Sequence, residues 1–387
     1  MTRTATIEAW IERAAIPLDA TTLELPALDH RWAAIEARLA RASVVVLGEL
    51  NHFVHEKADF RLWWLSRLNA LARSNGRRIV LVEELSWFDG LRVARYLHDG
   101  AEVHLDRLWT FGYTGNARDD RDDSPRGILK ASADLYPTEL FKAEQVRFYR
   151  GVRALGIREF SAVDIGGHDA GYELIGDAAS IARVPRESLQ DEAARLERVA
   201  TNEPAVRRVL AAMADSLRYT ALVNVAETYA GLAPGMAFRE DAMKRRLGEV
   251  LATLAPNDQL VLMAHAFHLA KDDRGIESIG VGPGGDRVPS LGHHLVHTLG
   301  REPFAVWWLY GAGEDSQPFP DLPRVQRYPK DSLNAQLAER GVPLVAALDG
   351  QLEARVGQLY SQAPRVNVAQ QADVVFFTPR VTPLRAS

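Results

Sequence analysis

The stretch from Val44 to Glu56 constrains the fold of this chain more than any other. Its first four residues, 44–47, are apolar and mostly β-branched, which predicts a strand buried inside a parallel sheet. The run stops at Gly48, and a carboxylate, an amide and two histidines follow it. Apolar residues then recur every three or four positions until Asn-Gly at 75–76, which is typical of a helix end. The stretch therefore predicts a strand, a polar loop and a helix in succession.

The same alternation of strands and helices continues along the chain. Further strands are expected at 78–82, 160–163, 259–263, 304–309, 344–347 and 373–377, and further helices at 7–14, 30–41 and 139–155. This order predicts the α/β class, with a mainly parallel central sheet flanked by helices. Residues 177–256 have an almost continuous helical pattern. We therefore expect an inserted helical subdomain within a single domain that spans residues 1–387, and a functional or mobile polar loop at 112–127.

The composition excludes several classes of protein. With 25% charged residues and a net charge of −5, the chain lacks the basic character that nucleic-acid binding normally requires. No apolar run is long enough to predict a membrane span. The absence of cysteine removes disulfides, thiolate metal ligands and a cysteine nucleophile. The first 20 residues lack the apolar core of a signal peptide, which favours a cytoplasmic location.

Polar side chains follow four of the predicted strands. They are Glu49 with His52, Glu83 with Glu84, Asp164, and His265 with His268. Because the carboxyl ends of parallel strands meet at one edge of a sheet, where α/β proteins bind ligands, we expect one shared polar site. Each carboxylate taken singly is more typical of a helix N-cap or of the first turn of a helix. Neighbouring residues of a strand face opposite ways, so we expect only one of Glu83 and Glu84 to enter the site.

The sequence narrows the chemistry of such a site. It contains no G-x-S-x-G motif, so the nucleophilic serine of an α/β-hydrolase is not expected. The glycine-rich stretch 280–285 contains a proline and lacks the phosphate-loop lysine, which indicates a surface loop. Histidine and carboxylate chemistry remains. A histidine held by a carboxylate can take a proton from water or an alcohol, and an arginine or a second histidine can stabilise the negative charge that develops.

Metal binding is the alternative use of the same residues. His52 and His55 form one pair spaced i,i+3, His265 and His268 form another, and a nearby glutamate could complete a site. Neither pair has the H-E-x-x-H spacing of zinc hydrolases. We therefore expect no metal and no other cofactor.

Several short motifs lie in a set order along most of the chain. They are Gly48-Glu49-Leu50-Asn51-His52-Phe53 with Arg61 nine positions after the histidine, Glu84-Leu85-Ser86-Trp87 with Tyr96 beyond it, Ala162-Val163-Asp164, Arg239-Glu240-Asp241-Ala242-Met243, and His265-Ala266-Phe267-His268 with Lys271 beyond it. In order and spacing they resemble the motifs of the erythromycin esterase family. The corresponding family segments read G-E-x-T-H-G, E-x-x-W, R-D-x-x-M at a helix start, and H-N-x-H.

The resemblance implies roles for these residues. His52 would be the general base that activates water, Glu49 and Glu84 would orient the base or the substrate, and Arg61 with His265 would stabilise the oxyanion. Family members open macrolide lactones without an obligatory metal. The neighbouring polar and aromatic residues are then expected to bind the substrate: Asn51, Phe53, His55, Glu83, Asp164, Arg239 and His268.

The departures from the family pattern lie beside the expected base. Asn51 and Phe53 stand where the family has threonine and glycine, and Ala266 stands where it has asparagine. Three functions therefore stay open: hydrolysis of an ester or lactone, such as a polyketide-type secondary metabolite; a non-hydrolytic tailoring reaction such as elimination, cyclisation or acyl transfer; and ligand or haem binding on the same scaffold. Each implies a small-molecule partner, and the chain is expected to be a monomer or homodimer.

Overall fold

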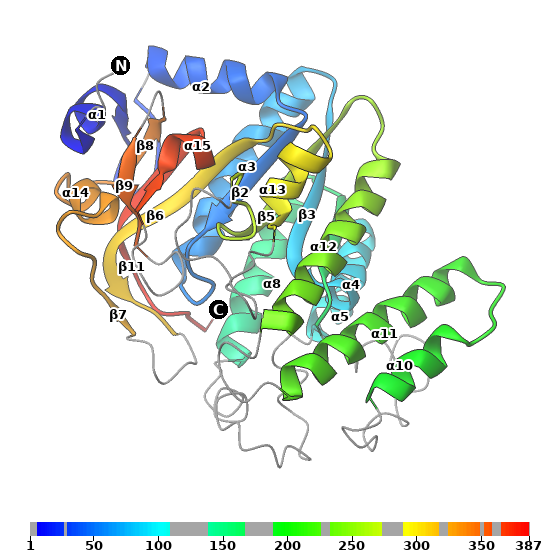
Figure 1. Cartoon of the computed structure of the whole chain (residues 1–387). Helices are drawn as coiled ribbons and strands as arrows, with labels where there is room; N and C mark the ends of the chain where they lie inside the picture. The colour runs from blue at the N-terminus through cyan, green and yellow to red at the C-terminus, as the bar shows by residue number, and fades with distance from the viewer. Residues whose placement is uncertain are drawn as a thin grey trace.

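The computed structural model describes residues 6–26, 29–108, 138–166, 189–225, 233–272, 289–316, 324–348, 352–357 and 365–386. The expected loops at 112–127 and 280–285 lie outside these residues. The fold is α/β, with a central sheet between layers of helices (Figure 1).

In the part of the chain that the structure describes, the sheet has nine strands and is mainly parallel. Its main order is β1 (Ala15–Pro17), β8 (Leu344–Ala347), β11 (Val374–Val381), β6 (Phe304–Glu314), β2 (Val44–Glu49), β5 (Asp258–His265), β3 (Arg78–Ser86) and β4 (Glu159–Asp164), with β7 (Val325–Gln326) beside β6. The strands from β11 to β4 pair in parallel, whereas β8, β1 and β7 pair antiparallel to their neighbours. A separate ribbon joins β9 (Glu353–Arg355) to β10 (Arg365–Asn367).

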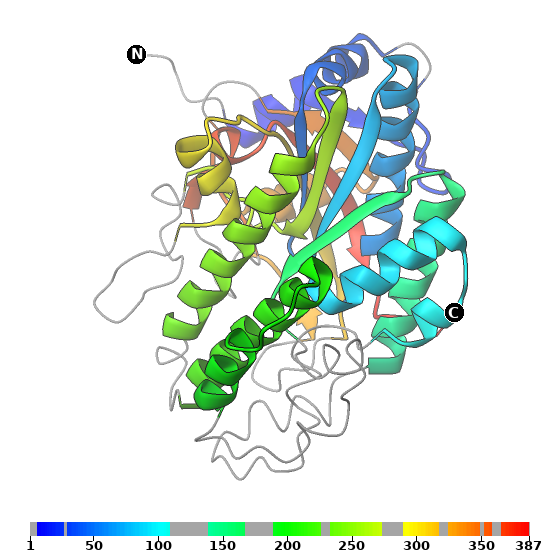
Figure 2. The ribbon, with the colours of Figure 1, turned by 90° about the vertical axis from the view of Figure 1, so that its right-hand side faces the viewer.

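Helices cover both faces of this sheet. They are α1 (Ile7–Ala14), α2 (His30–Arg41), α3 (Glu56–Ser74), α4 (Trp87–Asp99), α5 (Val103–Asp106), α8 (Thr138–Ala154), α10 (Leu189–Glu197), α11 (Pro204–Val225), α12 (Ala233–Thr253), α13 (Leu291–His293) with a π-helical turn (His294–Thr298), α14 (Leu333–Ala338) and α15 (Val368–Gln371). Seen from the side, α12 lies on one face of the sheet and α3 and α8 lie on the other (Figure 2).

Strand β2 lies in the middle of the sheet, and all six of its residues are buried. It is paired in parallel on both sides, so that its last residue, Glu49, lies opposite His265 of β5 and Trp308 of β6. The apolar residues of β2 thus carry a carboxylate to the carboxyl edge of the sheet, where polar groups of the neighbouring strands also end.

Gly48 allows the segments that follow β2 and β5 to pack closely. A Cβ at this position would lie 3.1 Å from the Cα of Ala266 and 3.1 Å from Trp307. The amide of Ala266 also donates to the carbonyl of Glu49 at 2.7 Å. The close approach therefore fixes His265 beside Glu49 through the backbone.

The expected helices at 7–14 and 30–41 and the expected strand at 344–347 are present with the predicted bounds. The other strands and helices that we expected by range are present with changed bounds. Strand β3 runs to Ser86 instead of ending near Val82, with a register shift between Glu83 and Ser86 in its pairing with β4. Helix α12 begins at Ala233, so Arg239 lies inside it, which makes the expectation of a helix start at Arg239 wrong. The short elements β1, β7, β9, β10, α5, α13, α14 and α15 were not expected, because segments of two to six residues carry too little periodicity.

The stretch expected to be helical, 177–256, contains α10, α11 and α12 in its described part. Helices α10 and α11 pack on each other around a small apolar cluster that also includes Phe88 of α4. Its status as an inserted subdomain of a single domain stays a prediction. In the described part of the chain, no helix is both long enough and apolar enough to cross a membrane.

Candidate active site

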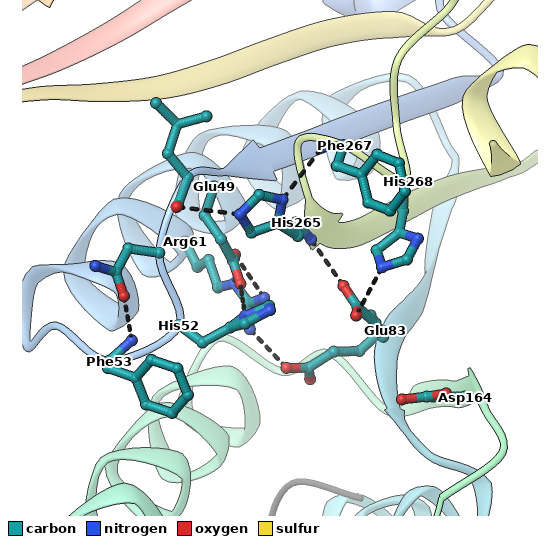
Figure 3. A network of polar contacts seen from close by, with 12 residues as sticks. Glu49, His52, Phe53, Arg61, Glu83, Asp164, His265, Phe267 and His268 are labelled. Atoms are coloured by element: carbon teal, nitrogen blue, oxygen red, sulfur yellow. Dashed lines mark hydrogen bonds and ion pairs between the residues drawn. The ribbon is translucent and has the colours of Figure 1, made fainter. Parts of the chain in front are cut away.

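The loop between β2 and α3 brings a carboxylate and a histidine together. Glu49 is fully buried, and its Oε1 lies 3.0 Å from Nδ1 of His52. Its Oε2 accepts hydrogen bonds from Nε and Nη2 of Arg61 at 3.0 and 2.7 Å. One carboxylate therefore contacts a histidine on one side and a guanidinium on the other (Figure 3).

Arg61 extends this network to β3. It lies one turn into α3, and its Nη1 donates to Oε1 of Glu83 at 2.5 Å. The other oxygen of Glu83 accepts a hydrogen bond from the hydroxyl of Tyr149 at 2.9 Å. The three donor nitrogens of Arg61 are thus directed at two buried carboxylates, which hold it as a cation and raise its pKa above the ordinary value.

The charges of this group support one another. Burial would raise the pKa of Glu49, but the cations of Arg61 and Lys57 and the hydrogen bond to His52 hold it down to about 2. Glu49 is therefore an anion at neutral pH. An anionic carboxylate beside Nδ1 favours the tautomer in which Nδ1 carries the proton and Nε2 is the basic nitrogen of His52.

His265 lies at the end of β5, and its ring centroid is 5.3 Å from that of His52. Its Nδ1 accepts from the amide of Phe267 at 3.3 Å, so its Nε2 carries the proton that binds the carbonyl of Leu50, 3.1 Å away. Burial, with the neighbouring His52, lowers the pKa of His265 to about 4. His265 is therefore a neutral ring that ties the β2 loop to the end of β5.

Glu84 forms the second half of the network, on the side of α12. Its oxygens accept from the amide of His265 at 2.8 Å and from Arg239 at 2.7 Å. Arg239 also donates twice to Asp164, at 2.8 Å each. The expected strand-end residues thus meet at one edge of the sheet, with α12 supplying the guanidinium between two of them.

His268 is held by two carboxylates. Its Nε2 lies 3.1 Å from Oε1 of Glu84, and its Nδ1 contacts Glu240 of α12. Burial opposes its charge, but these two carboxylates raise the pKa of His268 to about 10. His268 is therefore an imidazolium at neutral pH.

Glu83 and Glu84 both belong to the network, although we expected only one of them to enter the site. Alternation along β3 does turn them to opposite sides. Glu83 meets Arg61 and Tyr149, and Glu84 meets Arg239 and His268. Each carboxylate finds a cation on its own side, so the network extends around the edge of the sheet.

Three of the expected binding residues lie around the β2–α3 loop. The amide of Asn51 donates to Tyr310 at 3.1 Å and to Asp315 at 2.6 Å, and its oxygen accepts from the backbone of Phe53 at 2.8 Å. Asn51 thus fixes the loop to the carboxyl-terminal end of β6. The ring of Phe53 packs with Phe141 and Leu384.

His55 contacts Glu144 of α8 through Nδ1 and lies 4.0 Å from Asp59 through Nε2. His55 therefore contacts other carboxylates than His52 does, and the two histidines have no common carboxylate partner among these contacts. Among the described residues, no group of three or more histidine, aspartate or glutamate side chains is arranged to hold a metal ion.

A cavity of about 10 Å³ lies beside His52, which is roughly the space that one water molecule requires. It is lined by His52, Val54, Lys57, Ala58, Arg61, Phe141, Glu144, Gln145, Phe148 and Leu384. His52, Arg61 and Lys57 thus border the same small space.

The sequence interpretation missed Lys57, Glu144, Tyr149 and Glu240, which are all on helices. A signal existed for Lys57. Lys57 lies four residues before Arg61 on the buried side of α3. The apolar period of this helix predicts a hydrophobic residue at that position.

Fold and site together define a class of protein: an α/β fold with a histidine–carboxylate network at the carboxyl edge of a mainly parallel sheet. Solved structures with the same fold include the following three. They are a Bacillus cereus protein of a structural-genomics programme (TM-score 0.64, 14% identity, 98% of each chain covered), a succinoglycan biosynthesis protein (0.63, 14%, 98% of each) and a mutant of erythromycin esterase EreC in its open conformation (0.54, 15%, 95% of this chain and 97% of that one).

At these identities the likeness shows the fold, and the expected erythromycin esterase-like fold is thereby confirmed. No protein-family model matches the chain, and no curated protein matches it in sequence.

Proposed function

We propose that this protein is a hydrolase that cleaves an ester or lactone of a small molecule, with His52 as the general base. The observation that carries the proposal is the 3.0 Å contact between Glu49 Oε1 and His52 Nδ1, at the edge of the sheet where α/β proteins bind ligands. The fold shared with erythromycin esterase supports the reaction class. A polyketide-type lactone is the substrate that this likeness favours.

The mechanism follows from the charges around His52. Nε2 of His52 takes a proton from water while the water oxygen adds to the carbonyl carbon. Glu49, ionised and fixed by Arg61, then faces an imidazolium and stabilises it. The imidazolium returns its proton to the leaving alcohol as the ester bond breaks. No protein nucleophile and no metal is required for these steps.

The charged residues on the α12 side hold this arrangement in place. Glu84 accepts from the backbone of His265, and Arg239 and His268 neutralise Glu84. We assign Glu84, Arg239, Asp164 and His268 to positioning, because their polar atoms bind one another. Asn51 positions the loop from the other side, through Asp315.

Isotope incorporation tests the proposal. Purified protein would be incubated with erythromycin A and, separately, with p-nitrophenyl acetate in H₂¹⁸O, and the acid product analysed by mass spectrometry. Hydrolysis predicts one ¹⁸O atom per product, with undiminished turnover in the presence of EDTA. A product without added water would identify the non-hydrolytic tailoring reaction instead. Failure to turn over any ester, together with stoichiometric binding of haem, would favour the binding protein.

A further inference from the structure

Lys57 is a buried cation beside the proposed base. It is the second residue of α3, it is 6% exposed, and it borders the cavity that His52 also borders. Within the described part of the chain, no hydrogen bond or ion pair involves its Nζ. Nζ of Lys57 lies over the ring of Phe141, 4.9 Å from the ring centroid.

This position is unfavourable for a lysine on three counts. Burial removes the solvation of the ammonium group. The positive end of α3 disfavours a cation in the first turn, although Glu56 and Asp59 lie there too. Arg61, one turn further along the same face, repels it. Among the described residues, no direct ion pair compensates for these three effects, so stability does not explain the lysine.

The other N–H donors around His52, those of Arg61 and His265, already have hydrogen-bond acceptors. Arg61 directs Nε, Nη1 and Nη2 at Glu49 and Glu83, and the Nε2 proton of His265 binds the carbonyl of Leu50. These were the two residues expected to stabilise an oxyanion. Ester hydrolysis needs a donor where negative charge develops, and Lys57 meets that need at the cavity.

We propose that the Lys57 ammonium binds the carbonyl oxygen of the substrate and stabilises it as an oxyanion when water adds. This inference rests on the proposed hydrolysis. The cavity has room for about one water molecule, and an oxygen atom of a carbonyl group matches that size.

The step balances in atoms and charge. His52 takes one proton from water, the water oxygen forms a bond to the carbonyl carbon, and the carbonyl π pair moves onto the oxygen beside Lys57. When the intermediate collapses, that pair re-forms the carbonyl, the bond to the leaving oxygen breaks, and His52 gives its proton to that oxygen. Lys57 keeps its own protons throughout.

The protonation of Lys57 gives the site a pH dependence. Burial lowers the pKa of Lys57 to about 8, with Arg61 acting in the same direction and Glu49, Glu83 and Glu84 opposing it. His52 and Glu144 are the other titratable groups at this cavity. The ammonium is present below pH 8, so turnover is expected to fall as the pH rises through about 8.

Lys57→Met tests the proposal, because it keeps the length of the side chain and removes the charge. With p-nitrophenyl acetate we expect kcat to fall by about 10²–10³-fold, the usual effect of losing one oxyanion donor, with KM changed by less than threefold. The fall of wild-type kcat above pH 8 should disappear in the variant. The thermal midpoint should stay equal or rise, since an unpaired buried cation is removed.

Lys142→Met on α8 is the matched control, because Lys142 binds the carbonyl of Asp106 and does not border the cavity. A kcat within threefold of wild type, or a loss of stability that explains the loss of activity, overturns the proposal.

A second measurement needs no variant and no turnover. Methylphosphonate, a tetrahedral oxyanion, is the probe, and acetic anhydride labels lysines in the wild-type protein. We expect methylphosphonate to slow labelling of Lys57 at least fivefold while Lys142, in the same digest, is unaffected. Equal labelling of Lys57 with and without the probe contradicts the oxyanion site. If no ester is hydrolysed but Lys57 is protected, the proposed hydrolysis fails and the anion site stands.

Discussion

Glu49 is the residue on which the local structure of the site depends most. It is fully buried, yet its charge is stabilised by Arg61 and by the hydrogen bond to His52. A neutral amide at this position would leave the guanidinium of Arg61 with Glu83 alone. Since removing one partner of a buried ion pair leaves a charge without compensation, the change is costly.

We therefore expect Glu49→Gln to lower the free energy of unfolding by about 3–5 kcal/mol, measured by urea denaturation at pH 7. Glu102→Gln is the control, because the Glu102–Arg150 pair has a similar N–O distance of 2.8 Å but about half of each side chain is exposed. That change should cost less than about 1 kcal/mol. Equal effects of the two substitutions would show that Glu49 is not held as a buried anion.

The raised pKa of His268 makes the folded protein less stable at alkaline pH. This pKa is about 10 in the folded protein and near the ordinary 6.5 in the unfolded chain, so folding favours the imidazolium. The stabilisation is complete below pH 6.5 and is lost as the pH rises through 10. Urea denaturation between pH 6.5 and 10 should show falling stability, and His268→Gln should flatten this fall. A variant with the wild-type slope would remove this assignment.

At the residue scale, part of the site was predictable. The rule that polar residues follow parallel strands found Glu49, Glu84, Asp164 and His265, because strand ends have a fixed place in a sheet. Lys57 and Glu240 lie on helices, whose rotation about their axes depends on packing. The contacts of such residues follow from tertiary structure, which periodicity alone does not provide.

At the scale of elements, the close packing of α4 on β4 fixes the edge of the sheet that carries Asp164. A Cβ on Gly90 of α4 would lie 2.4 Å from the Cβ of Ala162. The helix must therefore move away from β4 if this glycine is replaced. Gly248 of α12 has no atom within 4 Å of the corresponding position.

These two glycines predict opposite results for the same substitution. Gly90→Ala should lower the thermal midpoint, because the clash outweighs the gain in helix propensity. Gly248→Ala should raise stability by about 0.5–1 kcal/mol, because alanine favours the helix. Differential scanning calorimetry of the two variants measures both changes. A more stable Gly90→Ala protein would contradict the packing of α4 on β4.

The main elements were predictable because their patterns are long. Most strands of the parallel part are continuous apolar runs, and the apolar period of α3 extends from Ala58 to Ala72, about four turns. The extension of β3 through Glu83 and Glu84 was not predictable from the sequence, because the burial of two successive carboxylates depends on cations from α3 and α12. The short antiparallel strands β1, β7, β9 and β10 have two or three residues each, which is too few to show a period.

At the scale of the whole molecule, the segment 382–385 holds the beginning of α3. Thr382 binds both carboxylate oxygens of Glu56, and its carbonyl accepts the amide of His55. The amide of Arg385 donates to Glu144 at 3.2 Å. Figure 1 correspondingly shows the C-terminus beside α8. The end of the chain thus supports the loop that carries His52.

Removal of residues 382–387 is expected to loosen that loop and lower turnover while the sheet stays folded. Hydrogen exchange should increase for residues 50–57 and stay unchanged for the central strands β2 and β5. Unchanged exchange in 50–57 would show that the segment does not support the loop.

The central claim is that His52 acts as the base, and His52→Gln tests it most directly. Glutamine keeps a hydrogen bond to Glu49 but cannot take the proton from water. The turnover number for p-nitrophenyl acetate should fall by about 10²–10⁴-fold, with KM and the thermal midpoint nearly unchanged. His104→Gln is the control, because His104 and Asp99 form a similar pair, 3.0 Å apart, on the surface. A folded His52→Gln protein that retains the turnover of the His104→Gln control would contradict the assignment of His52 as the base.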